Sequence, residues 1–227
     1  MNCQALREAV YEANMELVAR NLVTYTWGNV SGIDRTAGIV AIKPSGVAYA
    51  DLKPAQIVLL DLDGQVIDGG PRPSSDTPTH LELYRAFPAV GGVAHTHSPN
   101  ATAFAQACRA LPCLGTTHAD HFYGDVPVTR PMTATEVKAD YEAQTGMVII
   151  ETFEGLDPLA VPAVLVAFHG PFTWGVDPAG AVKNSVVLET VAGMAQATLQ
   201  LSPNQPAIPQ PLLDRHFLRK HSPGAYY

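Results

Sequence analysis

The stretch Gly92-Val93-Ala94-His95-Thr96-His97-Ser98-Pro99 sets the fold expected for this chain. Its apolar beginning predicts a short strand over 92–97. The Ser98-Pro99 pair predicts a helix directly after that strand, because serine is a favoured N-cap residue and proline suits the first helical position. A buried strand passing straight into a helix indicates a domain that mixes the two element types.

Similar signals lie on both sides of this stretch. Apolar residues at helical spacing predict a helix from Leu6 to Leu17. Thr77-Pro78, the Thr133–Glu136 capping box and Asp177-Pro178 each predict a further helix start. Strands are expected, from their apolar runs and a tight turn at Asp63-Gly64, over 25–31, 38–43, 57–62, 65–68 and 164–168. We therefore predict one domain over 1–227, a three-layer α/β/α domain with a mixed, largely antiparallel central sheet.

The C-terminal part carries a different pattern. Four prolines lie between Ser202 and Pro211, and such a segment cannot continue a helix. It is predicted to be a linker over 202–211 that leads to a short tail helix over 212–220.

Composition excludes several classes of protein. Charged residues make up only 15% of the 227 residues and sum to −7, and no basic run exceeds Arg219-Lys220, which argues against a nucleic-acid or anionic-membrane surface. No apolar run approaches about 18 residues, and acidic and basic residues interrupt the first twenty, unlike a signal peptide. Three cysteines without C-x-x-C spacing indicate free thiols. We expect a cytoplasmic protein with no membrane or nucleic-acid partner.

Histidines supply the sharpest functional signal. Because side chains alternate along a strand, His95 and His97 project from the same face and their imidazoles converge, an arrangement that suits a divalent transition metal. An exposed pair on an edge strand is the plainer alternative. His169 ends another apolar run, and Asp76 precedes a predicted helix, where it is either an oxygen ligand or a helix cap. Three histidines with or without a carboxylate match a catalytic zinc with an open position, and a zinc hydrolase is one reading of the ligands alone.

A second group of residues is suited to holding an anion. The turns Trp27-Gly28-Asn29, Lys43-Pro44-Ser45-Gly46 and Ser74-Ser75 present backbone N–H groups and hydroxyls, and Lys43 adds a positive charge. Each alone is more often an ordinary turn. The loop from Thr116 to His121 gathers polar groups that could act as acids or bases, with a solvated loop as the alternative.

Five blocks of this sequence together resemble the class II aldolase/adducin-head family. They are Trp27–Ser31, Ile42–Val47, Pro73–His80, His95–Ser98 and Gly115–Asp120. The resemblance runs in order from about Leu6 to Tyr227. It is weakest at Glu154–Pro162 and in the proline-rich segment.

The resemblance implies a role for each matching residue. It implies one zinc ion per subunit, a homotetramer with its sites at subunit interfaces, and Asp120 with Tyr227 as an acid/base pair supported by Glu142 and His216. The implied zinc ligands are Asp76, His95, His97 and His169, and the implied phosphate-binding residues are Gly28, Asn29, Lys43, Ser45, Gly46, Ser74 and Ser75.

The activity implied by the resemblance is the epimerisation of L-ribulose 5-phosphate to D-xylulose 5-phosphate. The C4 hydrogen is not adjacent to the carbonyl, so cleavage and re-formation of the C3–C4 bond avoids removing it. Aspartate at position 76 is the epimerase form, whereas related fuculose-phosphate aldolases carry glutamate there. The alternatives are a sugar-phosphate aldolase and, from another class, a non-catalytic adducin-like interaction domain.

Overall fold

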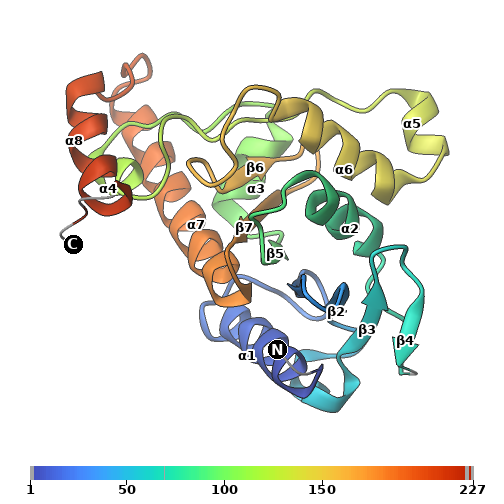
Figure 1. The fold of residues 1–227 in the computed structure, drawn as a ribbon. Coiled ribbons are helices and arrows are strands. Elements are labelled where there is room, and N and C mark those ends of the chain that lie inside the picture. The colour runs from blue at the N-terminus through green and yellow to red at the C-terminus, as the bar shows by residue number, and fades with distance from the viewer. Residues whose placement is uncertain (1–2, 69, 223–224, 226–227) are drawn as a thin grey trace.

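The frame of the protein is a seven-stranded sheet, seen in a computed structural model that describes residues 3–68, 70–222 and 225 (Figure 1). Its strand order is β4-β3-β2-β1-β5-β7-β6, and neighbouring strands pair antiparallel throughout. Among the described residues, parallel pairing is limited to an isolated bridge between Val128 and Leu165. The strands are β1 (Asn29–Asp34), β2 (Ile39–Ile42), β3 (Val58–Asp61), β4 (Val66–Asp68), β5 (Gly92–His95), β6 (Ala163–Leu165) and β7 (Pro171–Gly175).

Helices cover both faces of this sheet. The α-helices are α1 (Cys3–Ala19), α2 (Thr77–Ala86), α3 (Pro99–Gln106), α4 (Thr116–Ala119), α5 (Ala134–Lys138), α6 (Tyr141–Thr152), α7 (Pro178–Leu201) and α8 (Gln210–His221), with 3₁₀ turns η1 (Tyr49–Asp51) and η2 (Pro54–Gln56). Among the described residues, no helix has both the length and the apolar character needed to cross a membrane.

The alternation of side chains along β1 assigns the helices to their faces. Ser31 contacts the α2 side chains His80 and Tyr84 at 2.7 Å each. Gly32 faces the other way, toward Val10 of α1 and Pro178 of α7. Helices α1 and α7 therefore cover one face, while α2, with α6 packed against it, covers the other (Figure 1). The predicted α/β class and its three layers are confirmed. Among the described residues, the parallel pairing expected of a mixed sheet is limited to one isolated bridge.

A row of three glycines crosses the sheet beneath the first turn of α7. Gly32 pairs with Gly92, and Gly92 pairs with Gly175, so the three lie side by side on β1, β5 and β7. A Cβ atom would lie 2.6 Å from the Pro178 ring at Gly32 and 2.4 Å from the Asp177 backbone at Gly92. At Gly175 it would lie 2.6 Å from the backbone of Gly180. The start of α7 thus rests on bare backbone, a packing that only glycine permits.

Helix α3 is capped by a residue far away in the sequence. The predicted cap Ser98 makes no side-chain cap hydrogen bond. Instead, the Glu189 carboxylate on α7 accepts bonds from the backbone N–H groups of Asn100 at 2.9 Å and Ala101 at 3.0 Å. The proline signal located the helix start, but the partner of its N–H groups comes from another element. Because α3 follows His97 directly, this contact fixes the loop that carries that histidine.

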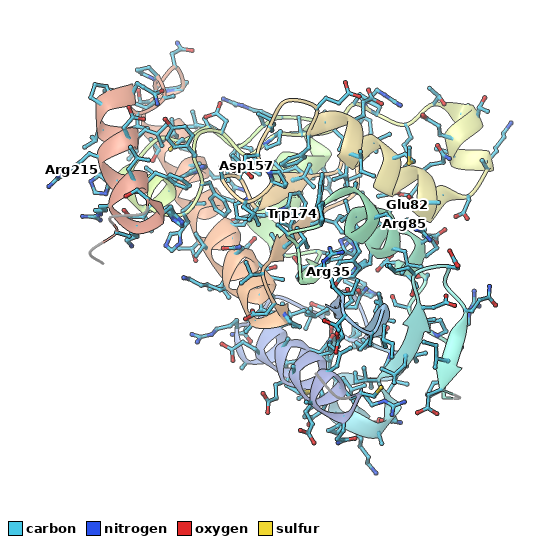
Figure 2. The ribbon with its side chains drawn as sticks, viewed as in Figure 1. Arg35, Glu82, Arg85, Asp157, Trp174 and Arg215 are labelled. Atoms are coloured by element: carbon cyan, nitrogen blue, oxygen red, sulfur yellow. The ribbon has the colours of Figure 1, made fainter. Side chains whose placement is uncertain are left out.

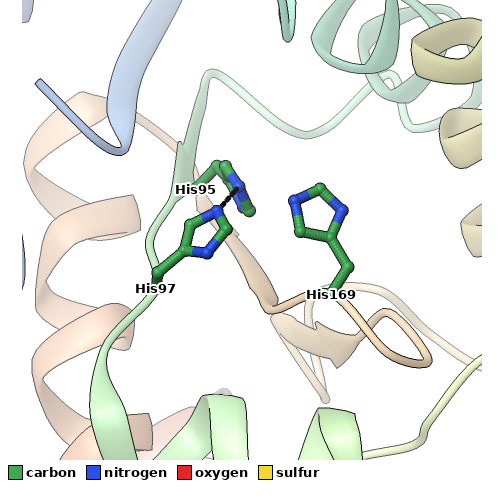
Figure 3. Close-up of side chains that lie close together, drawn as sticks. All are labelled: His95, His97 and His169. Atoms are coloured by element: carbon green, nitrogen blue, oxygen red, sulfur yellow. Dashed lines mark hydrogen bonds between the residues drawn. The ribbon is translucent and has the colours of Figure 1, made fainter.

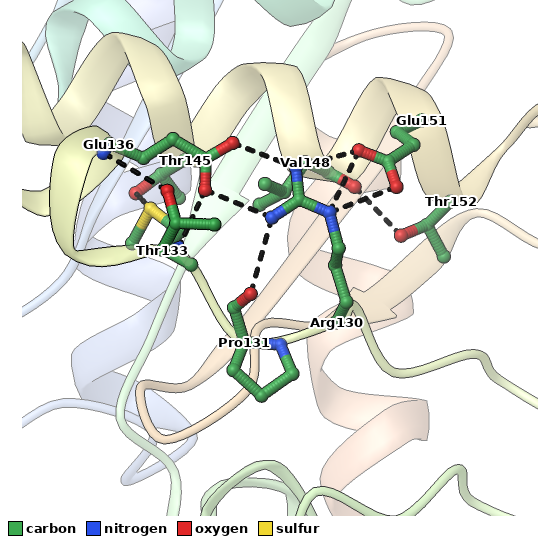
Figure 4. A network of polar contacts seen from close by, with 9 residues as sticks. Arg130, Pro131, Thr133, Glu136, Thr145, Val148, Glu151 and Thr152 are labelled. Carbon is green, nitrogen blue, oxygen red and sulfur yellow. Dashed lines mark hydrogen bonds and ion pairs between the residues drawn. The ribbon is translucent and has the colours of Figure 1, made fainter.

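Two arginines anchor the helices on the α2 side. Arg35, just after β1, donates to the carbonyls of Tyr84, Phe87 and Val90 around the end of α2 (Figure 2). Arg130 bonds the carboxylates of Glu136 and Glu151 and so ties α5 to α6 (Figure 4). The predicted capping box at Thr133 and Glu136 is confirmed. The helix that starts there, α5, is short, and a second helix, α6, begins at the Asp140 cap.

Several strand predictions are corrected. The expected strand over 25–31 begins only at Asn29, because Tyr25 and Gly28 take positive φ values of 53° and 76°. The expected strand over 92–97 is β5, which ends at His95. Strand β7, which begins at Pro171 and lies between β5 and β6, was not predicted. The predicted strand over 164–168 is the shorter β6, which ends at Leu165. The tail helix predicted over 212–220 is α8, and the proline-rich segment before it has no regular structure from 202 to 209.

The glycine row yields a stability prediction. Gly92→Ala should lower the free energy of unfolding by about 1–3 kcal/mol, because the new methyl group meets backbone atoms that cannot move aside. Gly115→Ala is the matched control, since a Cβ at Gly115 has no neighbour within 4 Å. Urea denaturation of both variants checks the expectation. Equal midpoints for the two would contradict the proposed close packing of α7 on the sheet.

Candidate active site

Three histidines form a cluster at the end of β5. His95 is its last residue, His97 follows two residues later, and His169 comes from the turn between β6 and β7 (Figure 3). Their potential ligand atoms all lie within 4.8 Å of one another. His95 lies on β5, and His169 lies two residues before β7, which pairs with β5. The pairing of these two strands therefore brings the three rings together.

A hydrogen bond to the backbone sets the tautomer of His95. Its Nδ1 lies 2.9 Å from the carbonyl oxygen of Pro171. A carbonyl only accepts hydrogen bonds, so Nδ1 carries the proton and Nε2 carries the lone pair. This Nε2 lies 3.0 Å from the Nε2 of His97. A backbone carbonyl behind a metal-binding histidine is a common outer-shell arrangement, and the donor set therefore fits a divalent metal.

Burial and mutual repulsion keep two of these histidines neutral. The pKa of His169 is lowered to about 4, by burial and then by the nearby His95 and His97. The pKa of His97 is lowered by the same effects, with burial first and His95 second. Neutral imidazoles have a free lone pair, so the cluster is prepared for a metal ion at neutral pH.

Asp76 lies beside the cluster but is not one of its three members. Its carboxylate accepts a 2.6 Å bond from the Asn29 side chain and makes no cap bond to α2. Asp76 thus occupies the N-cap position of α2, but its side chain makes no capping hydrogen bond. Burial alone would raise the pKa of Asp76, but His95, His80 and the Asn29 amide together hold that pKa below its usual range. An ionised carboxylate thus faces the histidines.

The predicted anion-binding residues gather around the same cavity. This cavity has a volume of about 420 Å³. All seven line it, together with Asp76, His95, His97 and His169; they are Gly28, Asn29, Lys43, Ser45, Gly46, Ser74 and Ser75. Backbone bonds from Ser74 to Lys43 and from Ser45 to Arg72 join the two loops that carry them. Gly28 allows close approach, since a Cβ there would lie 2.8 Å from the His95 carbonyl oxygen.

Lys43 brings a buried positive charge to this cavity. Its side chain is only 2% exposed and lies above the Tyr49 ring, with Nζ 4.7 Å from the ring centre. Nζ donates to the Val47 carbonyl at 2.9 Å. Burial lowers the pKa of Lys43, and a bound anion would favour its charged form.

Three of the implied site residues that the structure describes do not line this cavity. Asp120 ends α4, where its carboxylate contacts His216 of α8 at 3.0 Å. Glu142, at the start of α6, lines a neighbouring cavity that shares Ser74 and Ser75 with the first. Tyr227 lies outside the described residues. Within one chain, Asp120 and His216 therefore form a separate group on the α4–α8 side of the molecule.

The sequence patterns gave no role at the cluster to two of its neighbours. The Tyr141 hydroxyl lies 3.3 Å from His169 Nδ1, and the half-exposed Trp27 ring lies 6.2 Å from the His97 ring. Trp27 was named only as part of an anion-binding turn. His80, left without a role by the sequence patterns, is fully buried and bonded to Ser31, and burial lowers its pKa to about 3.

Known proteins are similar to this chain in sequence and in fold. Residues 8–196 match the family described as Class II Aldolase and Adducin N-terminal domain. The chain is 54% identical to the L-ribulose-5-phosphate 4-epimerase UlaF of Salmonella paratyphi C (strain RKS4594), over 99% of this chain and 98% of the relative. An L-fuculose 1-phosphate aldolase structure is similar at 24% identity, with a TM-score of 0.79 and coverage of 93% of this chain and 94% of its own. An L-fuculose 1-phosphate aldolase from Glaciozyma antarctica PI12 also has a TM-score of 0.79, at 19% identity over 98% of this chain and 84% of its own.

The histidine cluster yields a metal-binding prediction. His97→Ala should weaken zinc binding by more than about 100-fold, because a direct ligand is lost and even outer-shell changes cost 10- to 100-fold. His121→Ala, a histidine on the α4 side, should bind zinc like the unaltered protein. Competition against a chromophoric chelator measures both affinities. Equal zinc affinity in the His97 variant would show that the cluster is not the metal site.

Proposed function

The chain belongs to the class II aldolase and adducin N-terminal domain family, and we propose that it is a metal-dependent 4-epimerase that interconverts L-ribulose 5-phosphate and D-xylulose 5-phosphate. One observation carries this proposal. The histidine cluster and the anion-binding turns line a single cavity, so one small molecule bearing both a phosphate and oxygen ligands could reach them together. A zinc hydrolase would use the cluster but would not need the anion-binding turns.

The substrate's two ends call for different groups. A phosphate would be held by the Lys43 ammonium, the Ser45 and Ser75 hydroxyls and nearby turn amides, which are suited to an anion. The ketone end would lie toward Asp76 and the histidines. A divalent cation held by His95, His97 and His169, with Asp76 beside them, would supply positive charge where oxygen becomes negative during the reaction.

The reaction then requires a proton to move at the C4 hydroxyl. As the C3–C4 bond breaks, its electron pair stays with the three-carbon fragment, C4 becomes an aldehyde carbon, and its hydroxyl proton passes to a base. The aldehyde group rotates to present its opposite face while its phosphate stays bound. The three-carbon fragment then adds to that face, and the new C4 oxygen takes a proton from an acid. By family resemblance, Asp120 and Tyr227 fill these two roles, with Glu142 and His216 in support.

This assignment requires more than one subunit. Asp120 and His216 belong to the α4–α8 side and do not line the cavity of their own chain. We therefore propose that a neighbouring copy delivers Asp120 and Tyr227, in a homotetramer with one zinc ion per subunit and its sites between subunits. The thinly charged composition, 15% of residues, is compatible with surface covered by neighbours.

Conversion of L-ribulose 5-phosphate tests the activity directly. The metal-loaded protein should form D-xylulose 5-phosphate, and a chelator should abolish the conversion, because the cation supplies the charge stabilisation. In deuterated water the product should carry no deuterium at C4, because the C4 hydrogen never leaves its carbon. NMR of the products measures both results.

Other products would point elsewhere. Free glycolaldehyde phosphate as the main product would favour an aldolase over the epimerase. Deuterium at C4 would contradict cleavage of the C3–C4 bond. Absence of any reaction with a zinc-loaded tetramer would favour a non-catalytic, adducin-like role.

Two substitutions test the acid/base pair. Asp120→Asn and Tyr227→Phe should each lower kcat by at least about 100-fold, the scale of one lost general acid or base. Neither should change the zinc content, because neither residue belongs to the histidine cluster. Steady-state rates and metal analysis measure the two effects. Loss of zinc in either variant would count against the assigned role.

A further inference from the structure

The carboxylate of Asp120 is surrounded by basic side chains from α8. Arg219 Nη2 lies 2.9 Å from Oδ1 and 3.0 Å from Oδ2, so it holds both oxygens. Lys220 Nζ lies 3.2 Å from Oδ2, and His216 Nδ1 lies 3.0 Å from Oδ1. All these side chains are at most 25% exposed. They are shielded more than an ordinary surface ion pair, so their interaction is screened less.

The packing of α8 does not need this charge cluster. Leu213 of α8 packs with Cys113 and Ala119 in a small apolar core. Phe217 lies against the Tyr123 ring at 5.0 Å, and the Tyr123 hydroxyl donates to Asp214 at 2.6 Å. These contacts already dock α8 on the segment around α4. The ion pairs at Asp120 are therefore available for a purpose besides docking.

The titratable groups that face Asp120 are basic. Burial alone would raise the pKa of the Asp120 carboxyl. The hydrogen bonds from His216, Arg219 and Lys220 outweigh this effect and hold the pKa below its usual range. The titratable groups around it are His216, Arg219, Lys220 and His221 of α8, His121 after α4, and Lys183 of α7, which faces His121. None of these is acidic.

We propose that Arg219, which lies outside the residue set implied by the family resemblance, is a positioning residue that keeps Asp120 ionised and fixed at the end of α4. This inference rests on the proposed function, in which Asp120 is one of the two acid/base groups. It makes that function more specific, because an ionised Asp120 enters the reaction as the proton acceptor.

The proton inventory of the cycle follows from this state. Asp120 accepts the C4 hydroxyl proton as the C3–C4 bond breaks. The other group, the phenol of Tyr227, starts protonated, because a free tyrosine loses its proton only near pH 10, and it donates that proton on re-addition. Asp120 then holds the extra proton, which returns to the phenolate through water before the next turnover. In the reverse direction the two groups exchange roles.

Arg219→Met tests the inference through the pH profile of kcat/KM. With one cation lost, the acidic limb should move up by about one pH unit, the scale of a single adjacent charge. The loss of rate should be large at low pH and should shrink toward the alkaline plateau. Arg219→Lys, which keeps a positive charge, should restore most of the shift. Zinc content should stay unchanged in both variants.

Arg215→Met is the matched control. Arg215 lies on the same helix, is exposed and points away from the fold (Figure 2), so its removal should leave the profile unchanged. A lower melting temperature with an unmoved acidic limb in Arg219→Met would show a purely structural role and overturn the inference. If that variant does not fold, Lys220→Met replaces it, with a smaller upward shift expected and an unmoved limb as the contrary result.

A readout without catalysis separates this inference from the proposed function. Carbon-13 NMR of labelled aspartates, with Asp120→Asn for assignment, gives the titration midpoint of Asp120 directly. That midpoint should rise by about one pH unit in Arg219→Met. A protein that does not epimerise L-ribulose 5-phosphate yet shows this rise would refute the proposed function alone. An unchanged midpoint would refute the role of Arg219, whatever the activity.

Discussion

The close seating of α7 on the sheet is the constraint on which the rest of the structure depends. Three paired glycines, Gly32, Gly92 and Gly175, leave bare backbone for the first turn of this helix. From that seat α7 reaches Glu189, whose carboxylate holds the start of α3 directly behind His97. On the opposite face of the same strands, β5 presents His95. The helix on one face thus determines where the chemistry lies on the other.

The candidate site combines two kinds of preparation. His97 and His169 are kept neutral by lowered pKa values, and the His95 ring is oriented by the Pro171 carbonyl. Lys43, in contrast, is a buried cation whose Nζ donates to the Val47 carbonyl. The cavity brings candidate ligands for a cation and for an anion together. The net charge of −7 does not conflict with an anionic substrate, because Lys43 and the turn amides can make one pocket positive within an acidic chain.

Much of this arrangement could be predicted from local sequence. The convergence of His95 and His97 was predicted from strand alternation, although β5 ends at His95 and His97 lies just beyond it. The Asp177 cap and the Thr133 capping box were placed by short-range rules. What escaped prediction depends on distant partners. Strand β7 was not predicted, because its first residue is a proline. Pro171 has no N–H to donate, but its carbonyl accepts the hydrogen bond from the Thr96 backbone just after β5. The cap of α3 lies 89 residues away on α7, and the cations around Asp120 come from α8, about 100 residues later in the chain.

Pro171 illustrates how backbone pairing can set the orientation and tautomer of a side chain. Its single carbonyl oxygen accepts from both the Thr96 backbone and the His95 ring, so the alignment of β5 with β7 and the tautomer of His95 depend on the same atom. A slip of one residue between these strands would move the ring to the other face and remove its acceptor. The ring nitrogen that His95 presents to His97 is therefore set by the pairing of β5 with β7.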